Sequence, residues 1–228
     1  VLELGGSNAF IVLEDANLEK AVATAVNARM QNAGQSCIAA KRFLVHENIV
    51  EEFVAKLKVA IQNLKTGNPF DKEMQIGSLA RVDLAEELEA QVQKSIQMGA
   101  DLIVGGTRKE AFYEPTILAN VTTEMPVFNE ETFGPVASII TFKTLEEAIE
   151  LSNQSEFGLG VSIFTQDIDF IKTKISAFNE GAVFINEMVK SDPRLPFGGI
   201  KKSGYGRELA EDGIKEFVNI KTIVINTF

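Results

Sequence analysis

The sequence predicts an α/β protein built on a mostly parallel, twisted sheet that helices cover on both faces. Apolar runs of four to seven residues, typical of strands buried on both sides, alternate with longer segments of helical periodicity. Such alternation is typical of parallel strands joined by crossover helices. At 228 residues, the chain is long enough to form one large domain or two small ones around a substantial core.

The first half of the chain begins with a buried apolar run at residues 10–13. Asp15 and Asn17 follow it and offer side-chain oxygens that suit the start of a helix. Apolar residues then recur at helical spacing through Met30, and Gly34 is expected to end this helix. The further elements predicted in this half are a strand at residues 42–46, a helix at 47–64, a helix at 81–98 and a strand at 101–104.

The second half repeats the alternation after Pro115. Strands are predicted at residues 136–142, 159–164 and 182–185, and helices at 145–151, 170–178 and 207–217. Residues 220–228 predict a further strand at the extreme C-terminus. Because an apolar strand needs an edge to pair with, we expect this segment to be an oligomerisation arm, and the chain to form a homo-oligomer.

The composition is that of a soluble globular protein, with 45% hydrophobic and 24% charged residues. A net charge of -10, from 22 basic and 32 acidic residues, disfavours nucleic acid and anionic membranes as partners. No apolar run is long enough to span a bilayer. One cysteine excludes an internal disulfide framework and fits a reducing, cytoplasmic location. A single histidine, His46, disfavours a metal site or a histidine-based triad, so we expect no metal and a carboxylate as any general base.

Cys37 is the one candidate nucleophile of thiol type in the chain. It follows Gly34 and Ser36, whose small side chains let the backbone come close to a substrate. A lone cysteine in an α/β protein is more often an inert core residue. The negative end of the preceding helix would not help its thiol to ionise, so activation is expected from backbone donors or from the positive ring of a bound cofactor.

Four short sequence motifs, taken in their order along the chain, change the interpretation of Cys37. The sequence closely resembles the aldehyde dehydrogenase superfamily from end to end, through residues 3–6 (Glu-Leu-Gly-Gly), 32–37 (Asn-Ala-Gly-Gln-Ser-Cys), 130–135 (Glu-Glu-Thr-Phe-Gly-Pro) and 196–199 (Pro-Phe-Gly-Gly). Four ordered motifs are far more specific than any one of them. The resemblance implies an NAD- or NADP-dependent enzyme that oxidises a small-molecule aldehyde to a carboxylic acid through a cysteine thiohemiacetal and a thioester.

The resemblance also implies roles for individual residues. Cys37 would be the nucleophile, and Glu3 the base that activates the water for thioester hydrolysis. Glu131 would bind the nicotinamide ribose and Phe133 would line the nicotinamide pocket. Phe197 would form a wall of the aldehyde pocket. Taken without the resemblance, each residue has a simpler interpretation as a solvated acid or an apolar anchor.

Arg194 precedes that wall in a segment that resembles the succinate-semialdehyde dehydrogenase branch. An arginine at this position suits a substrate carboxylate, which it would bind in bidentate geometry. Asp192 is an alternative partner within the same loop.

Family members are much longer than this chain, so we expect it to be their catalytic half. Residues 1–217 would form the catalytic domain and 218–228 the arm, with the dinucleotide-binding domain absent. The isolated chain would then fold without oxidising aldehydes. Two alternatives remain open: a catalytically silent assembly module of the same fold, and a cysteine hydrolase that uses His46, which is disfavoured.

Overall fold

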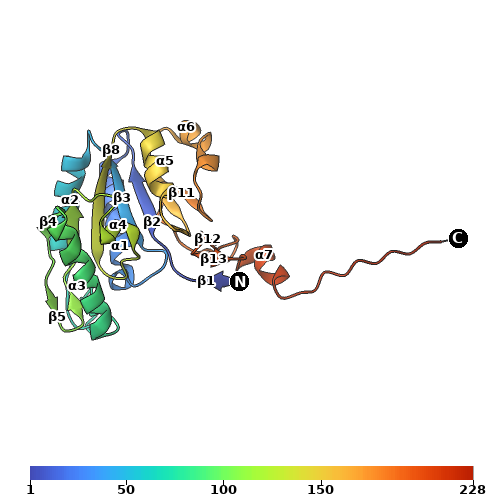
Figure 1. The fold of residues 1–228 in the computed structure, drawn as a ribbon, viewed down its shortest axis with the longest axis horizontal. Helices are drawn as coiled ribbons and strands as arrows, with labels where there is room; N and C mark the ends of the chain where they lie inside the picture. Colours follow the sequence, from blue (N-terminus) through green and yellow to red (C-terminus); the bar gives the residue numbers. More distant parts are fainter. Residues whose placement is uncertain (228) are drawn as a thin grey trace.

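A seven-stranded sheet forms the centre of the molecule in the computed structural model, which describes residues 1–227 (Figure 1). All neighbouring strands are parallel except the pair β7 and β4 at one edge, which is antiparallel. The sequence prediction of a mostly parallel α/β sheet is therefore confirmed. From edge to edge the strands are β11 (Val183–Ile185), β10 (Val161–Phe164), β2 (Asn8–Val12), β3 (Ala40–His46), β8 (Val136–Phe142), β7 (Thr116–Ala119) and β4 (Asp101–Val104).

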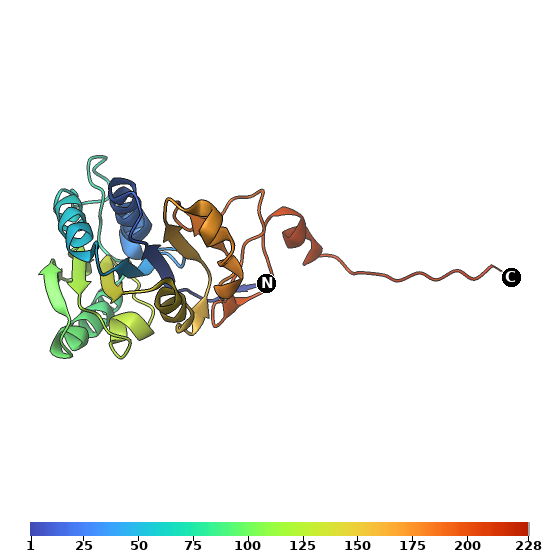
Figure 2. The same cartoon turned by 90° about the horizontal axis from the view of Figure 1, so that it is seen from above.

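Helices cover both faces of the sheet (Figure 2). One face carries α1 (Leu18–Met30) and α2 (Val50–Gln62), and the other carries α3 (Val82–Gln97), α4 (Pro126–Asn129) and α5 (Leu145–Asn153). The chain runs from β2 through α1 to β3 in one direction across the sheet, and from β8 through α5 to β10 in the other. Since crossovers between parallel strands are right-handed, opposite directions place α1 and α5 on opposite faces.

The sequence explains where two of the helices, α1 and α5, begin. The side chain of Asn17 caps α1 by accepting a hydrogen bond from the backbone N–H of Lys20, and Thr144 caps α5 in the same way. Asp15, the other predicted cap, instead accepts hydrogen bonds from Thr165 and from two backbone N–H groups in the loop after β10. It therefore joins the carboxyl ends of β2 and β10.

The remaining elements are short. Three antiparallel pairs lie outside the central sheet: β1 (Leu2–Glu3) with β13 (Gly204–Tyr205), β5 (Arg108–Lys109) with β6 (Phe112–Tyr113), and β9 (Phe157–Gly158) with β12 (Ile200–Lys201). The helix predicted at 170–178 is divided into α6 (Ile168–Lys172) and the 3-10 helix η2 (Ile175–Ala177), and the one at 207–217 is shortened to α7 (Ala210–Lys215). No helix among the described residues is long and apolar enough to cross a membrane.

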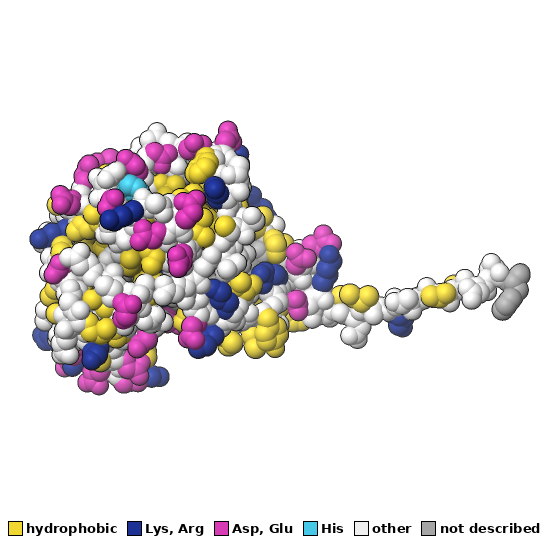
Figure 3. Space-filling model, turned by 45° about the horizontal axis from the view of Figure 1, so that its top comes forward, with side chains coloured by type: hydrophobic (Ala, Val, Ile, Leu, Met, Phe, Trp, Pro, Cys, Tyr) yellow, Lys and Arg dark blue, Asp and Glu magenta, His cyan; other side chains and the backbone are white. Residues whose placement is uncertain are grey.

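The predicted C-terminal strand is not confirmed. Residues 218–227 have no regular secondary structure and extend away from the sheet (Figures 1 and 2), and Phe228 lies outside the described residues. Hydrophobic side chains are visible along this tail in Figure 3, and Ile220 is 94% exposed. A strand is stable only when its backbone groups find a partner, and this single chain gives the tail none.

Candidate active site

Three of the four sequence motifs lie immediately before neighbouring parallel strands. Gly6 and Ser7 precede β2, Cys37 precedes β3, and Pro135 precedes β8. Since β2, β3 and β8 are adjacent and parallel, their amino ends lie at one edge of the sheet. The topology therefore brings motifs that are far apart in the sequence to a single place.

Glycines allow these motifs to approach each other closely. A Cβ on Gly6 would lie 2.7 Å from the carbonyl oxygen of Cys37, and one on Gly5 would lie 2.6 Å from Oε2 of Glu131. A Cβ on Gly34 would lie 2.2 Å from the carbonyl oxygen of Gly134. Each distance is too short for a real side-chain carbon. Gly6 and Gly34 are thus required by backbone contacts between motifs, whereas at Gly5 the close neighbour is the end of the flexible Glu131 side chain.

The Cys37 loop follows α1 through the 3-10 helix η1 (Gln31–Gly34). Asn32, Ala33 and Gly34 have φ values of 50°, 54° and 75°, so three successive residues adopt the left-handed region. Ala33 is also buried, which makes this turn a costly one that its surroundings must hold in place. The turn directs the chain from the end of α1 to the amino edge of β3.

The Cys37 thiol is half-buried and is not activated in the chain as it stands. Burial raises its pKa most, and the charges of Glu3 and Glu131 raise it further. The charge of Lys41 and a hydrogen bond from the Ile38 backbone N–H lower the pKa of the thiol. The net effect of these groups is a thiol pKa above its ordinary value.

Glu3 lies in β1, which pairs with Gly204 of β13. Partial burial raises the pKa of this carboxyl above its ordinary value, and Glu208 raises it further while Arg207 lowers it. Glu3 is close enough to Cys37 for its charge to raise the pKa of the thiol. A carboxyl with a raised pKa suits a general base near neutral pH.

Glu131 lies between the first motif and the cysteine loop. Its Oε1 accepts a hydrogen bond of 2.9 Å from the backbone N–H of Gly6 and lies 3.5 Å from Nζ of Lys41. Phe133, two residues on, is 39% exposed, and the Lys41 ammonium lies 5.9 Å from the centroid of its ring. The carboxylate and the aromatic ring thus flank one cation.

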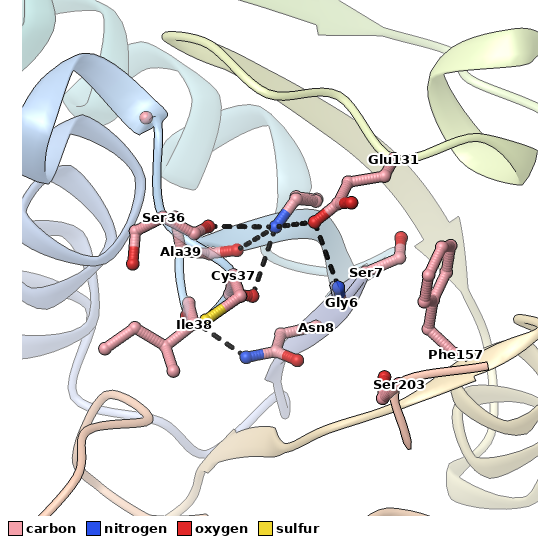
Figure 4. A network of polar contacts seen from close by, with 12 residues as sticks. Gly6, Ser7, Asn8, Ser36, Cys37, Ile38, Ala39, Glu131, Phe157 and Ser203 are labelled. Carbon is pink, nitrogen blue, oxygen red and sulfur yellow. Dashed lines mark hydrogen bonds and ion pairs between the residues drawn. The ribbon is translucent and has the colours of Figure 1, made fainter. Parts of the chain in front are cut away.

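That cation, Lys41, was not identified by sequence reasoning. Its Nζ donates hydrogen bonds of 3.2 Å to the carbonyl oxygens of Ser36, Cys37 and Ala39, and these contacts meet the one from Glu131 at a single nitrogen (Figure 4). The side chain is fully buried, and burial lowers the pKa of Lys41 to about 7. The available signal was a lysine directly before the strand predicted at 42–46, where a buried charge needs partners.

Arg29, in α1, is a second buried cation at this edge. Its Nη2 donates a hydrogen bond of 2.6 Å to the carbonyl oxygen of Gly34, while Nε and Nη1 have no hydrogen-bond partner among the described residues. Burial lowers the pKa of Arg29 to about 9, and Glu131 opposes that effect. Arg29 therefore binds the last carbonyl group of the left-handed turn, that of Gly34.

Phe197 and Cys37 share a small apolar cluster that is separate from the main core. Phe197 is buried with Leu159 and Val189, and Cys37 and Ile38 pack against the three of them. Beside this cluster, Asn8 donates a hydrogen bond to the Ile38 carbonyl oxygen and accepts one from the backbone N–H of Gly160. The cluster therefore gives the Cys37 side chain an apolar neighbourhood on one side.

Arg194 makes its polar contacts with Asp192. Its Nε and Nη2 lie 2.9 Å and 2.6 Å from the two carboxylate oxygens, and its side chain is 85% exposed. Asp192, which the sequence offered as an alternative partner, is thus the partner observed. Among the described residues, no group of three or more His, Cys, Asp or Glu side chains is placed to hold a metal ion.

Comparisons with known proteins identify the family of the chain. The model of the aldehyde dehydrogenase family matches residues 1–223. The chain is 50% identical to the NAD(P)+ succinate semialdehyde dehydrogenase Sad of Escherichia coli over 98% of this chain and 49% of that protein. It is 51% identical to a probable NADP+ succinate-semialdehyde dehydrogenase of Synechocystis over 99% of this chain and 50% of that protein.

A solved structure shows the same fold. The crystal structure of succinate-semialdehyde dehydrogenase from Burkholderia pseudomallei matches with a TM-score of 0.94 and 38% identity, over 97% of this chain and 46% of that one. The chain spans about half the length of the curated relatives it matches. On the match of the family model and the shared fold, the chain belongs to the aldehyde dehydrogenase family.

Proposed function

We propose that this chain is the catalytic half of an NAD(P)-dependent dehydrogenase that oxidises a carboxylate-bearing aldehyde such as succinate semialdehyde. The observation that carries this proposal is the meeting of Cys37, Glu3 and Glu131 at the amino edge of β2, β3 and β8. The names of the E. coli and Synechocystis relatives support the substrate class and the coenzyme.

The proposed reaction uses Cys37 and Glu3 in succession. The Cys37 thiol first releases its proton to solvent. The resulting thiolate adds to the aldehyde carbon, and a C–S bond forms while the carbonyl oxygen becomes an oxyanion. Loss of hydride from that carbon restores the carbonyl and leaves a thioester on Cys37. Glu3 then takes a proton from water, which attacks the thioester, and the carboxylic acid leaves as the C–S bond breaks. The apolar wall at Phe197 limits the water that reaches the thioester.

The residues around Glu131 fit a nicotinamide ribose. The Glu131 side chain is 23% exposed, and the space beside its Oε2 exists because residue 5 is a glycine. Its carboxylate would accept hydrogen bonds from the ribose hydroxyls, and the exposed ring of Phe133 would lie along the nicotinamide. When bound, NAD(P)+ supplies the hydride acceptor.

The domain organisation is part of the same proposal. Residues 1–217 would form the catalytic domain and 218–228 an arm for association with a second copy. A dinucleotide-binding domain would come from residues outside these 228. In support, neither the glycine pair before β5 nor any other described glycine stretch leads from a strand into a helix as a phosphate-binding loop does.

A chimera tests the proposal. The N-terminal half of the E. coli relative is joined ahead of Val1, and NAD(P)H formation from succinate semialdehyde is measured for the chimera, for its Cys37→Ser variant and for the chain alone. We expect activity in the unmodified chimera only. In Cys37→Ser a neutral hydroxyl replaces a thiolate and is a far weaker nucleophile, and the chain alone would lack the dinucleotide-binding domain. Retention of a tenth of the turnover in Cys37→Ser would contradict the proposal, as would NADH formation by the chain alone.

A further inference from the structure

Lys41 is a buried ion that the proposed reaction does not use. It lies at the start of β3, its side chain has no exposed surface, and its ammonium donates hydrogen bonds of 3.2 Å to three backbone carbonyl oxygens. An ammonium has three N–H donors, so the carbonyls of Ser36, Cys37 and Ala39 match its capacity. The Cys37 loop is thus folded around this one nitrogen.

The same nitrogen connects the loop to the other motifs. Lys41 lies 3.5 Å from Oε1 of Glu131, and that oxygen also accepts the hydrogen bond from Gly6 (Figure 4). Gly6 in turn follows the segment that carries Glu3. A single cation therefore links the segments of the nucleophile, of the ribose-binding carboxylate and of the base.

The charges around Lys41 come from several elements. Arg29 faces it from α1, Glu131 from the segment before β8, and Cys37 from its own loop. Of the charged side chains that act on Cys37, Lys41 lowers the pKa of the thiol whereas Glu3 and Glu131 raise it. Lys41 is therefore the neighbour whose charge favours an anion at the sulfur.

We propose that Lys41 is a positioning residue, which fixes the Cys37 loop against Glu131 and places a positive charge beside the reacting thiolate. The proposal rests on Cys37 being the nucleophile of the proposed function. Since Lys41 has no exposed surface, it acts on an incoming reactant through space rather than by contact. Its field favours a negatively charged reactant over a neutral one of the same size.

Alkylation of the purified chain measures this charge directly. Cys37 is the chain's only cysteine, so every alkylation event reports one site. The second-order rate constants for iodoacetate and iodoacetamide are measured at pH 6.5, below the pKa of Lys41 of about 7, where the ammonium is present. Their ratio reports the local charge, because both reagents consume the same thiolate and the effects of thiol pKa and loop mobility cancel.

We expect Lys41→Met to lower the ratio of iodoacetate to iodoacetamide rates by about three- to tenfold, as the loss of one charge at close range requires. Lys41→Gln, which keeps hydrogen-bond donors without the charge, should lower it equally and gives a second result if the Met variant folds poorly. Lys20→Met, at an exposed lysine of α1, should leave the ratio unchanged.

A purely structural Lys41 would give a different result. Loosening of the loop would change both rate constants by the same factor and leave their ratio at the wild-type value in Lys41→Met and Lys41→Gln, which would overturn the proposal. Failure of the proposed function is seen separately, in the activity of the Cys37→Ser chimera. The ratio is measured without coenzyme or aldehyde, so the two outcomes are independent.

Discussion

At the scale of single residues, the site is made by groups that are costly to the fold. Lys41 and Arg29 are fully buried charges, and Ala33 is buried in a left-handed conformation. Such groups persist where the surrounding structure holds them, and here they hold the Cys37 loop. The pKa of the Cys37 thiol is higher than that of an ordinary cysteine, mainly because the side chain is partly buried. The buried cations therefore fix the conformation of the Cys37 loop, but the pKa of its thiol is still raised.

The pH dependence of the free energy of unfolding should show that burying the charged form of Lys41 destabilises the fold. Its pKa is lowered from 10.5 to about 7, so between these values the unfolded chain holds a proton that the folded chain has lost. The free energy of unfolding therefore rises with pH in this window, by up to about 1.4 kcal/mol per pH unit. Urea unfolding of wild type and Lys41→Met at pH 7, 8 and 9 should show this rise in the wild type relative to the variant. Parallel pH dependences would contradict it.

Arg194 should matter for one class of substrate. If it binds a carboxylate in the chimera, Arg194→Ala should raise the KM for succinate semialdehyde by the equivalent of about 1.5–3 kcal/mol and spare an uncharged aldehyde of similar length. Asp192→Asn is the matched control: it removes the ion pair that engages Arg194, and should lower the KM for the charged substrate. Equal effects on both aldehydes would show that Arg194 only stabilises its loop and does not bind the substrate carboxylate.

At the scale of elements, parallel pairing accounts for the site. Three of the four motifs precede β2, β3 and β8, and these adjacent parallel strands bring the three positions together. The apolar runs predicted the strands well because buried parallel strands are continuously apolar. Lys41 and the left-handed turn at residues 32–34 were not predicted, because their stability comes from carbonyls and backbones that approach only after folding. Tertiary contacts of this kind leave no periodicity in the sequence.

Two glycine substitutions separate the cost of backbone strain from the cost of a clash between the motifs at Gly34 and Gly134. Gly34 and Gly99 both have positive φ, but a Cβ at Gly34 would meet the Gly134 carbonyl at 2.2 Å, whereas one at Gly99 would meet nothing within 4 Å. We expect Gly99→Ala to cost about 1–3 kcal/mol from strain. Gly34→Ala should cost about 1–3 kcal/mol more from the clash. Urea unfolding measures both, and equal losses would show that the contact between the two motifs does not matter.

At the scale of the whole molecule, the described residues form a buried core and an exposed tail. The central sheet is covered on both faces, while Ile220, Ile223, Val224 and Ile225 are between 73% and 94% exposed. The sequence predicted the apolar character of this segment correctly. Its strand conformation is absent in the described residues because strand formation depends on a partner edge, which is a property of an assembly rather than of one chain.

Removal of the tail should change the association state. We expect the full chain to form dimers or larger assemblies in sedimentation velocity, and a chain that ends at Val218 to sediment as a monomer. Lys221→Ala, a substitution in the same tail that keeps its apolar residues, is the matched control and should associate like the full chain. Identical sedimentation of the full and shortened chains would contradict a role of the tail in association.

The covalent intermediate tests the central claim most directly. In the chimera, Glu3→Gln removes the proposed base, which should slow turnover by about 10²- to 10⁴-fold and leave the acyl group on the enzyme. After incubation with succinate semialdehyde and NAD(P)+, peptide mass spectrometry should find this group on the peptide that contains Cys37. An acyl group on another peptide, or none while Glu3→Gln turns over at the predicted slow rate, would contradict the account.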